Sequence, residues 1–361
     1  MIVKNEAHVI RRCLDSVRPF IDSWVIVDTG SKDGTQDIIR DHFKDVPGEL
    51  HERPWKNFGH NRSEALSLAR HRANYLFVMD ADDELILAAN FQRLDMKASA
   101  YSLQIEHGNN EHWRPCLVST KLDWRYVGVL HEYLDSGEGH TAEKLAGAKI
   151  RIHAEGDRST GDDAARKYLN DAETLENALL TEPENTRYVF YLAQSYRDAG
   201  ELKKSLRTYQ RRAEMGGWDE EVWYSHYEVA KLSERLKLAP EIVTQCYLDA
   251  YQVRPQRVEP LVQLARIFRE RKQFALALLF ARKAKDLPRP ADILFLESNA
   301  YDWQALDEFA VASYWTGNYK DCAAACESLL KGNTLPFEYL ARVTGNLKFA
   351  LEKLGKRPSS P

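Results

Sequence analysis

The sequence predicts two folds in succession: an α/β domain built on a mostly parallel sheet, then an all-α domain of helical repeats. Up to about residue 155, short apolar runs alternate with amphipathic helical patterns, which is typical of strand–helix–strand units. After Gly161 the periodicity is helical throughout. Similar helical segments then recur roughly every 34 residues, a spacing that indicates tetratricopeptide-like repeats.

In the first half, four apolar runs predict strands, at residues 2–3, 24–27, 49–53 and 75–79. Apolar residues spaced by three and four predict the helices between them, at 6–17, 35–43 and 61–72, with Thr35 as a candidate cap. From Tyr101 to His153 the pattern shifts to strands at 101–105, 113–119, 124–129 and 149–152. Glycines 137, 139 and 147 suggest loops there.

The second half repeats its own features. Three alanines in similar contexts, at 193, 230 and 265, are 37 and 35 residues apart. The segment 200–206 is echoed by 317–323, and prolines 183, 255 and 288 fall between predicted helices. We therefore place the α/β domain at 1–158, the repeat domain at 159–355 and a disordered tail at 356–361.

Composition narrows the function classes. The 50 Lys and Arg residues against 54 Asp and Glu give a net charge of −4, which argues against a nucleic-acid partner. No apolar run reaches the ~20 residues that span a bilayer. Five scattered cysteines fit reduced thiols, so we expect a cytoplasmic protein without a membrane span.

The acidic stretch 80–84 is the strongest chemical signal. The apolar run 75–79 leads directly into four carboxylates within five residues. Carboxylates crowded at a strand end repel one another unless a cation lies among them, and Mg²⁺ or Mn²⁺ prefers oxygen ligands and is often shared with substrate phosphates. The alternative is an acidic turn that caps a helix beginning near Leu85.

A second polar site follows another strand. Residues 25–27 deliver Asp28 to the carboxyl edge of the predicted sheet, where ligands bind in such folds. Gly30 and Gly34 then allow a tight turn. A carboxylate at this edge can accept hydrogen bonds from a base or a ribose hydroxyl, whereas Asp33 and Thr35 are better interpreted as helix caps.

These segments together resemble glycosyltransferase family 2. The motifs that carry the resemblance are, in chain order, Met-Ile-Val-Lys-Asn-Glu (1–6), Val-Asp-Thr-Gly-Ser-Lys-Asp-Gly-Thr (27–35), Trp-Lys-Asn-Phe-Gly-His-Asn-Arg (55–62), Asp-Ala-Asp-Asp (80–83) and Trp-Arg-Tyr-Val-Gly-Val-Leu-His-Glu (124–132). The family implies a GT-A fold, a Rossmann-like catalytic domain that binds a nucleotide-sugar donor. The helical half resembles the tetratricopeptide tail of one bacterial branch of this family.

The resemblance implies roles for the acidic residues. Asp28 would contact the nucleoside, and Asp80 would contact ribose or bridge to the metal. Asp82 would bind Mn²⁺ or Mg²⁺, which holds the donor diphosphate, and Ala81 lies between these two donor-site acids. His153 would complete the metal shell or contact a phosphate; a merely structural histidine is the alternative.

The remaining donor contacts come from two other segments. The family places nucleotide contacts at Lys4, Asn5 and Glu6, although Glu6 can also simply begin a helix. Arg62 would reach a donor phosphate, since a guanidinium suits that geometry; a solvated arginine on a helix face is the alternative.

Inverting transfer needs a base that takes a proton from the acceptor. His131 and Glu132 follow a glycine-containing strand and are the candidates. Glu132 suits a hydroxyl acceptor, whereas His131 can act as base, as metal ligand or as a hydrogen-bonded core residue. The choice between them stays open, and the role of Arg114 in the same cleft is also open.

The sequence therefore predicts a metal-dependent, inverting glycosyltransferase that uses a nucleotide sugar, with a UDP-sugar as the family expectation. The acceptor is a glycan, a lipid-linked glycan or a protein, and the repeats bind that acceptor or a partner protein. The family usually has more apolar residues before Met1, so the first strand is either clipped or short. A repeat scaffold with a degenerate nucleotide domain is the main alternative, and a nucleotidyltransferase is a weaker one.

Overall fold

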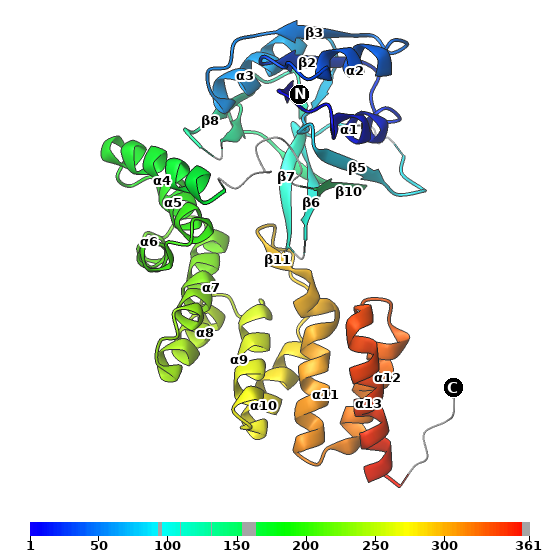
Figure 1. Ribbon diagram of the computed structural model, residues 1–361, viewed down its shortest axis with the longest axis vertical. Coiled ribbons are helices and arrows are strands. Elements are labelled where there is room, and N and C mark those ends of the chain that lie inside the picture. The colour runs from blue at the N-terminus through cyan, green and yellow to red at the C-terminus, as the bar shows by residue number, and fades with distance from the viewer. Residues whose placement is uncertain (93–95, 109, 131, 154–163, 356–361) are drawn as a thin grey trace. The chain divides into compact units, whose positions relative to one another are not determined.

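The chain forms two compact units, Met1–Glu201 and Leu202–Pro361. The structure is a computed structural model that describes residues 1–92, 96–108, 110–130, 132–153 and 164–355. His131 and the predicted tail at 356–361 lie outside the described residues. Figure 1 shows the course of the chain.

The first three strands form the predicted parallel sheet. They are β1 (Ile2–Val3), β2 (Trp24–Asp28) and β3 (Gly48–Glu52), in the order β1-β2-β3. The connecting helices are α1 (Ile10–Val17), α2 (Thr35–His42) and α3 (Phe58–Ala69). Thr35 is not the cap of α2. Gly34 holds that position at φ 90°, without a side-chain cap, because only a left-handed residue turns the chain sharply enough there.

The rest of the α/β unit is a mixed sheet, which corrects the expectation of a mostly parallel one. Its strands are β4 (Tyr75–Phe77), β5 (Asp83–Leu87), β6 (Ala100–His107), β7 (Asn110–Ser119) and β10 (Ala142–Ile152). Strand β6 pairs antiparallel with β7 and parallel with β10, and both β4–β7 and β10–β5 are antiparallel. A separate hairpin joins β8 (Arg125–Val127) to β9 (Tyr133–Asp135).

The segment after the acidic cluster is a strand and not the helix that the alternative interpretation placed near Leu85. Asp83 and Leu85 are buried while Glu84 and Ile86 are half-buried, the alternation of a strand. Pairing with β10 stabilises it, with Leu85 opposite Ile150. Gly147 was expected in a loop, but it lies within β10 at φ 78°, where the register with β6 shifts.

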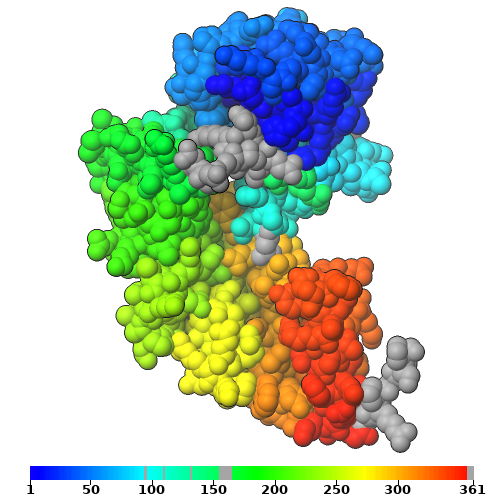
Figure 2. All heavy atoms as spheres, in the orientation of Figure 1, coloured from blue at the N-terminus to red at the C-terminus, as the bar shows by residue number. Residues whose placement is uncertain are grey.

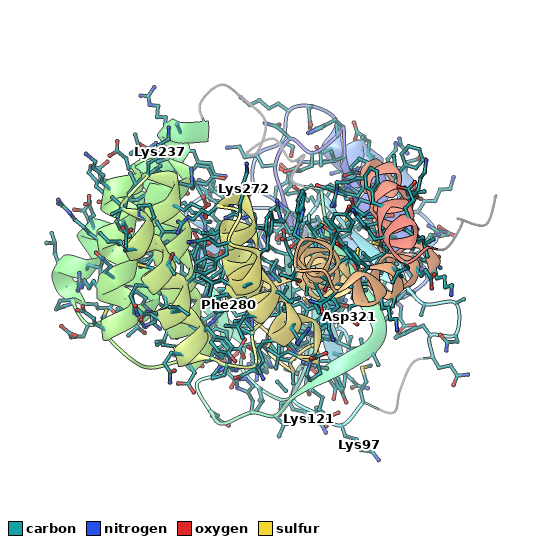
Figure 3. The ribbon with its side chains drawn as sticks, turned by 90° about the horizontal axis from the view of Figure 1, so that it is seen from below. Lys97, Lys121, Lys237, Lys272, Phe280 and Asp321 are labelled. Atoms are coloured by element: carbon teal, nitrogen blue, oxygen red, sulfur yellow. The ribbon has the colours of Figure 1, made fainter. Side chains whose placement is uncertain are left out.

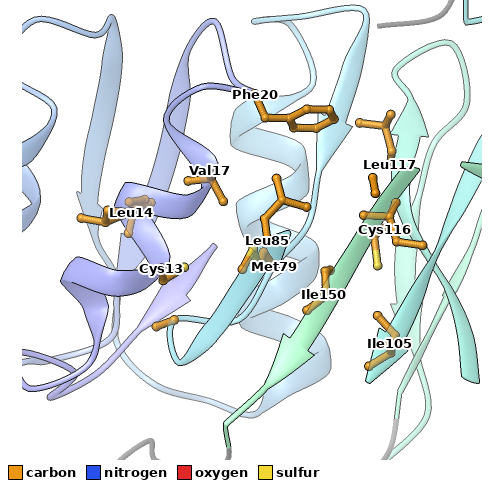
Figure 4. Packing of buried hydrophobic residues seen from close by; sticks show 14 of the residues in the cluster. Cys13, Leu14, Val17, Phe20, Met79, Leu85, Ile105, Cys116, Leu117 and Ile150 are labelled. Atoms are coloured by element: carbon orange, nitrogen blue, oxygen red, sulfur yellow. The ribbon is translucent and has the colours of Figure 1, made fainter. Parts of the chain in front are cut away.

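One apolar core holds this unit together. Side chains of α1, β5, β6, β7 and β10 meet in it, as Figure 4 shows. Cys13 and Leu14 of α1 are fully buried there, as are Leu103 and Ile105 of β6. The core lies directly behind the acidic segment, because Met79 and Leu85 at either side of it point inward. The backbone of the acidic residues is therefore firmly anchored.

The helical part of the chain consists of antiparallel neighbours. The α/β unit ends with α4 (Ala164–Thr181) and α5 (Thr186–Asp198). The second unit contains α6 (Leu202–Glu214), α7 (Asp219–Arg235), α8 (Pro240–Val253), α9 (Glu259–Glu270), α10 (Phe274–Lys285), a short strand β11 (Leu296–Glu297), a π-helical turn η1 (Ala300–Gln304), α11 (Ala305–Trp315), α12 (Tyr319–Lys331) and α13 (Phe337–Lys353). From α6 to α13 the helices form a continuous packed series, as the space-filling view shows in green to red. None of the described helices combines the length and the apolarity that a bilayer crossing requires.

The predicted repeat positions are structurally equivalent. Alanines 193, 230 and 265 lie on α5, α7 and α9, and none has exposed surface. Two residues after the end of each of these helices, and of α11, stands a residue with positive φ: Gly200, Lys237, Lys272 and Gly317. Figure 3 labels the two lysines at these helix ends. The backbone amide of the residue that follows each of these four donates to the carbonyl oxygen five residues before it, at 2.8 to 3.0 Å. This hydrogen bond is characteristic of a Schellman turn.

Candidate functional site

Asp28 ends β2 in a preorganised turn. Its side chain is buried, and Oδ1 accepts hydrogen bonds from the amides of Gly30 and Ser31 at 2.7 and 2.8 Å. Gly30 takes φ 111°, which a side chain at this position would oppose. Within the described part of the chain, Oδ2 of Asp28 is buried without a hydrogen-bond partner. A buried carboxylate oxygen of this kind is a ready acceptor for a ligand donor.

The loop that carries Lys4, Asn5 and Glu6 is tied to the loop after Asp28. The amide of Asn5 donates to Oγ of Ser31 at 2.9 Å, and the amide of Glu6 donates to Oγ1 of Thr35 at 2.8 Å. In return Oδ1 of Asn5 accepts from the amide of Lys32 at 2.9 Å. Asn5 takes φ 57° to do this. Asn5 and Glu6 therefore hold the two loops together, while the side chain of Lys4 is exposed beside them.

Asp33 and Thr35 also help to hold these two loops together. Asp33 accepts from the amide of Ala7 at 2.9 Å and from Oγ1 of Thr35 at 2.6 Å. These hydrogen bonds lower the pKa of Asp33 although partial burial opposes the shift. The cap interpretation of both residues missed this role, because the bonds join segments that are 26 and 29 residues apart.

Arg62 joins two of the predicted site acids. Its Nη2 donates to Oδ1 of Asp80 at 2.6 Å, and its Nη1 donates to Oε1 of Glu132 at 2.6 Å. The guanidinium also faces the rings of Phe58 and Tyr126, with centroids at 5.2 and 5.5 Å. Arg62 is therefore not the solvated helix-face arginine of the alternative interpretation. Arg62 of α3 therefore links Asp80, three residues after β4, to Glu132, the residue before β9.

Arg114 of β7 lies on the other side of Asp80. Its guanidinium is 3.9 Å from Oδ2 of Asp80 and 3.7 Å from Oδ2 of Asp83. Burial disfavours a charged Asp80, but Arg62 and Arg114 outweigh it and lower its pKa. The pKa of Asp83 shifts in the opposite direction. Burial and, after it, the negative charge of Asp80 raise this pKa to about 7, although the positive charge of Arg114 acts against the rise. The strand end is thus crowded with negative charge that two arginines only partly balance.

The proposed metal ligands differ in how well they fit a cation. Asp80, Asp82 and Asp83 act on one another electrostatically, and carboxylate oxygens are the donors that Mg²⁺ and Mn²⁺ prefer. His153 follows β10, and its Nε2 lies 2.9 Å from Oε2 of Glu84 on the neighbouring strand β5. Among the described residues no three acidic, histidine or cysteine side chains form a metal-binding group. The acids fit a Mg²⁺-type ion that is bound by one or two carboxylates and completed by phosphate and water.

The segment between these acids is fixed by its backbone. Ala81 is buried, and the carbonyl oxygen of Asp82 accepts from Nη2 of Arg12 at 3.1 Å. The carbonyl of Asp80 accepts from Sγ of Cys13 at 3.4 Å. Helix α1 therefore sets the path of the acidic segment, a contribution that no local motif in the sequence indicates.

Of the two candidate bases, the structure describes only Glu132. Its carboxylate is 4% exposed and bonded to Arg62. Phe58 and Tyr126, whose rings face the guanidinium of Arg62, were not predicted as functional residues. Both lie in the motifs that carry the family resemblance. Glu84 was missed because its proximity to His153 depends on the β5–β10 register.

Comparison with known proteins supports the resemblance to glycosyltransferase family 2. Residues 1–94 match the family model described as Glycosyl transferase family 2, and this segment of the chain belongs to that family. The glycosyltransferase SunS from the SPbeta prophage of Bacillus subtilis is 24% identical over 231 residues, which are 58% of this chain and 53% of SunS. The chain thus spans about half the length of that relative.

Two further similarities are to proteins described as containing TPR repeats. A TPR repeat-containing protein of Synechococcus elongatus is 27% identical over 305 residues, 79% of this chain and 73% of the relative. The crystal structure of YrrB, described as a TPR protein with an unusual peptide-binding site, aligns at 15% identity and a TM-score of 0.41, covering 52% of this chain and 87% of YrrB. The C-terminal helices of the present chain form a tetratricopeptide-like domain, as the helix pairs and equivalent turns described above indicate.

Proposed function

We propose that this chain is a metal-dependent, inverting glycosyltransferase that moves a sugar from a nucleotide sugar, with UDP as the nucleotide, to an acceptor. The observation that carries the proposal is the pair of acidic strand ends in a family 2 segment: buried Asp28 with an unbonded oxygen, and the crowded acids that begin at Asp80. The first can accept from a nucleoside and the second can attract a cation with its diphosphate.

Each acid has a distinct task in this proposal. Asp28 accepts a hydrogen bond from the base or the ribose through Oδ2. Asp80 contacts the ribose or the metal, and Asp82 is the main metal ligand. A bound Mn²⁺ or Mg²⁺ would neutralise charge on the departing nucleoside diphosphate. Lys4 and Arg62 would contact a donor phosphate, and His153 would complete the metal shell or contact a phosphate in exchange for its contact with Glu84.

The base that receives the acceptor proton is Glu132 or His131. Glu132 already lies in the cluster, held by Arg62. A base must reach the proton that it removes, and the geometry tightens only when substrates bind. The acceptor can be a glycan, a lipid-linked glycan or a protein. The repeats offer a surface for that acceptor or for a partner protein, because stacked helix pairs form extended binding faces.

The decisive experiment is Asp82→Ala in the full chain, assayed with a panel of nucleotide sugars and Mn²⁺. We expect turnover to fall at least 100-fold, about 2.7 kcal/mol of transition-state stabilisation, while the melting temperature stays within a few degrees. Asp123→Ala is the matched control, since that carboxylate is 83% exposed and pairs only with Arg70 among the described contacts. Full activity of the Asp82 variant would refute its role.

Calorimetry with UDP separates this proposal from a repeat scaffold whose nucleotide domain is degenerate. A glycosyltransferase should bind UDP more tightly with Mn²⁺ than without it, and Asp82→Ala should remove that difference. Binding that is absent in both conditions would favour the scaffold.

A further inference from the structure

The connection between β8 and β9 carries Glu132 and needs support from other elements. Each of the two strands has three residues, and among the described strands they pair only with each other. A two-stranded hairpin of this kind is marginally stable by itself. The connection is also open to solvent, since Val129 is 47% exposed and Tyr133 is 44% exposed. The position of the Glu132 carboxylate therefore depends on the elements that pack against this connection.

Helix α3 holds the β8 side of the connection. Oγ of Ser63 accepts a hydrogen bond from the amide of Tyr126 in β8 at 2.9 Å. A Cβ atom built on Gly59 would lie 3.5 Å from the carbonyl oxygen of Gly128, so the start of α3 lies close to the turn that follows β8. Arg62 of the same helix binds the Glu132 carboxylate. None of these three contacts involves β9.

Helix α5 contacts the connection from another side. It lies in the same compact unit, although the sequence placed it in the repeat domain. The guanidinium of Arg187 faces two tyrosine rings, with centroids at 4.9 Å for Tyr133 of β9 and 4.8 Å for Tyr191 of α5. Burial raises the pKa of Tyr188, and a hydrogen bond from the backbone amide of Val129 to its hydroxyl acts against the rise. Two consecutive residues of α5 thus contact the connection before and after the candidate base.

The first turn of α5, which makes these contacts, is itself well fixed. Asn185 caps the helix, because its Oδ1 accepts from the amide of Tyr188 at 3.1 Å. Its Nδ2 donates to Oε2 of Glu182 at 2.9 Å. The next two residues, Val189 and Phe190, have no exposed surface. A capped and closely packed turn leaves the backbone few alternative positions, so it can serve as a rigid support.

We propose that Arg187 and Tyr188 are positioning residues for the transfer reaction, because they hold the β8–β9 connection so that the Glu132 carboxylate keeps one position. The inference rests on the proposed function, in which this connection supplies the base. Neither residue touches substrate; they act through Tyr133 and Val129. A shift of a reacting group by about 1 Å can cost roughly 100-fold in rate, so a contact that restrains the connection affects turnover.

The test uses three single variants of the full chain. Arg187→Ala removes the cation from the contacts described above, and Tyr188→Phe removes only the hydroxyl. Tyr196→Phe is the matched control, because its hydroxyl donates to Glu176 of α4 at the other end of α5. The control changes the packing of the helix pair and leaves the β8–β9 connection untouched. The measurements are amide hydrogen exchange in the connection, melting temperature, kcat and donor KM.

We expect both α5 variants to speed amide exchange in the connection, by roughly fivefold for Arg187→Ala, and the control to leave it unchanged. The kcat value should fall roughly tenfold for Arg187→Ala and about threefold for Tyr188→Phe. Donor KM should stay within about twofold of the parent value, because the donor site is not altered. A merely structural role would lower the melting temperature in all three variants without separating kcat from KM.

Unchanged exchange in both α5 variants would overturn the inference, whether or not the parent chain transfers sugar. Faster exchange with an unchanged kcat would also overturn it, because the connection would then be held without consequence for the reaction. A parent chain without turnover on the panel of nucleotide sugars would refute the proposed function, and with it the reaction that these residues are proposed to serve.

Discussion

Two arginines that each bind two carboxylates show how differently the two units use the same chemistry. In the helical unit Arg257 is fully buried, and it binds Glu259 at 2.7 Å and Asp292 at 3.3 Å while its guanidinium lies 3.6 Å from the centre of the Trp223 ring. In the α/β unit Arg62 also joins two carboxylates between aromatic rings, but it is 22% exposed and its partner Asp80 is 34% exposed. The first cluster is closed around its charges, whereas the second is open to a ligand.

This contrast separates a structural cluster from a functional one. A closed cluster contributes to the fold and offers no atom to solvent or substrate. An open one keeps charged groups that are only partly neutralised at the surface, an arrangement found where chemistry is done. Changes at Arg257 should therefore affect stability, and changes at Arg62 should affect turnover more than stability.

The largest expected effect on stability is that of Arg257→Ala. The substitution leaves the buried carboxylate of Glu259 without its arginine partner, while Asp292 keeps its closer bonds to Arg254. It also removes donors to the carbonyls of Leu294 and Phe295. Removing one partner of a buried ion pair typically costs about 3–5 kcal/mol. Urea denaturation followed by far-ultraviolet circular dichroism would measure the loss. As control, Arg282→Ala should cost less than about 1 kcal/mol, because its pair with Asp321 is half exposed. Equal losses would contradict the contrast.

A smaller effect on stability, but a large one on activity, is expected for Arg62→Ala. Glu132, only 4% exposed, would lose its cationic partner, at a cost of about 2 kcal/mol. If Arg62 positions Glu132 as the base, kcat should fall at least 50-fold, while KM for the donor changes only a few-fold. Steady-state kinetics with varied donor would separate the two parameters.

The lysine variant sharpens this prediction. Arg62→Lys keeps the charge but cannot bridge two carboxylates with one planar fork, so kcat should recover only in part. A variant that restored full kcat would show that charge alone suffices. A large rise in donor KM with unchanged kcat would support the proposed contact of Arg62 with a donor phosphate and contradict its role in positioning Glu132.

The helical part of the chain was more predictable than the α/β fold because its determinants are local. Alanines 193, 230 and 265 revealed the repeat through their spacing alone, and all are fully buried. Gly200 and Gly317 marked equivalent helix ends in the echoed segments. Lysines 237 and 272 take the same positive φ, yet no sequence signal marks them, because the Schellman turn overrides the preference of the residue.

The α/β unit was predictable in its motifs and not in its pairings. The apolar run before Asp80 and the strand before Asp28 were found where expected. The antiparallel pairing of β4 with β7 was not, since partner choice depends on a strand about 40 residues away in the chain. Similarly, the contact of Arg62 with Glu132 joins residues 70 positions apart. Residue type and spacing predicted the participants, but only the tertiary structure shows which of them meet.

The smallest expected effect tests the equivalence of the repeat turns. Lys272 takes φ 59° where Gly317 takes φ 80° in the corresponding turn, and an L side chain is disfavoured in this region. Lys272→Gly should therefore raise the free energy of unfolding of the helical unit by about 0.5–1 kcal/mol. Gly317→Ala should lower it by about 1 kcal/mol. The space around Gly317 is open, so this loss reflects the backbone alone. As control, Lys348→Gly in the middle of α13 should cost about 1 kcal/mol, and a destabilising Lys272→Gly would show that this lysine contributes more through its side chain than its backbone costs.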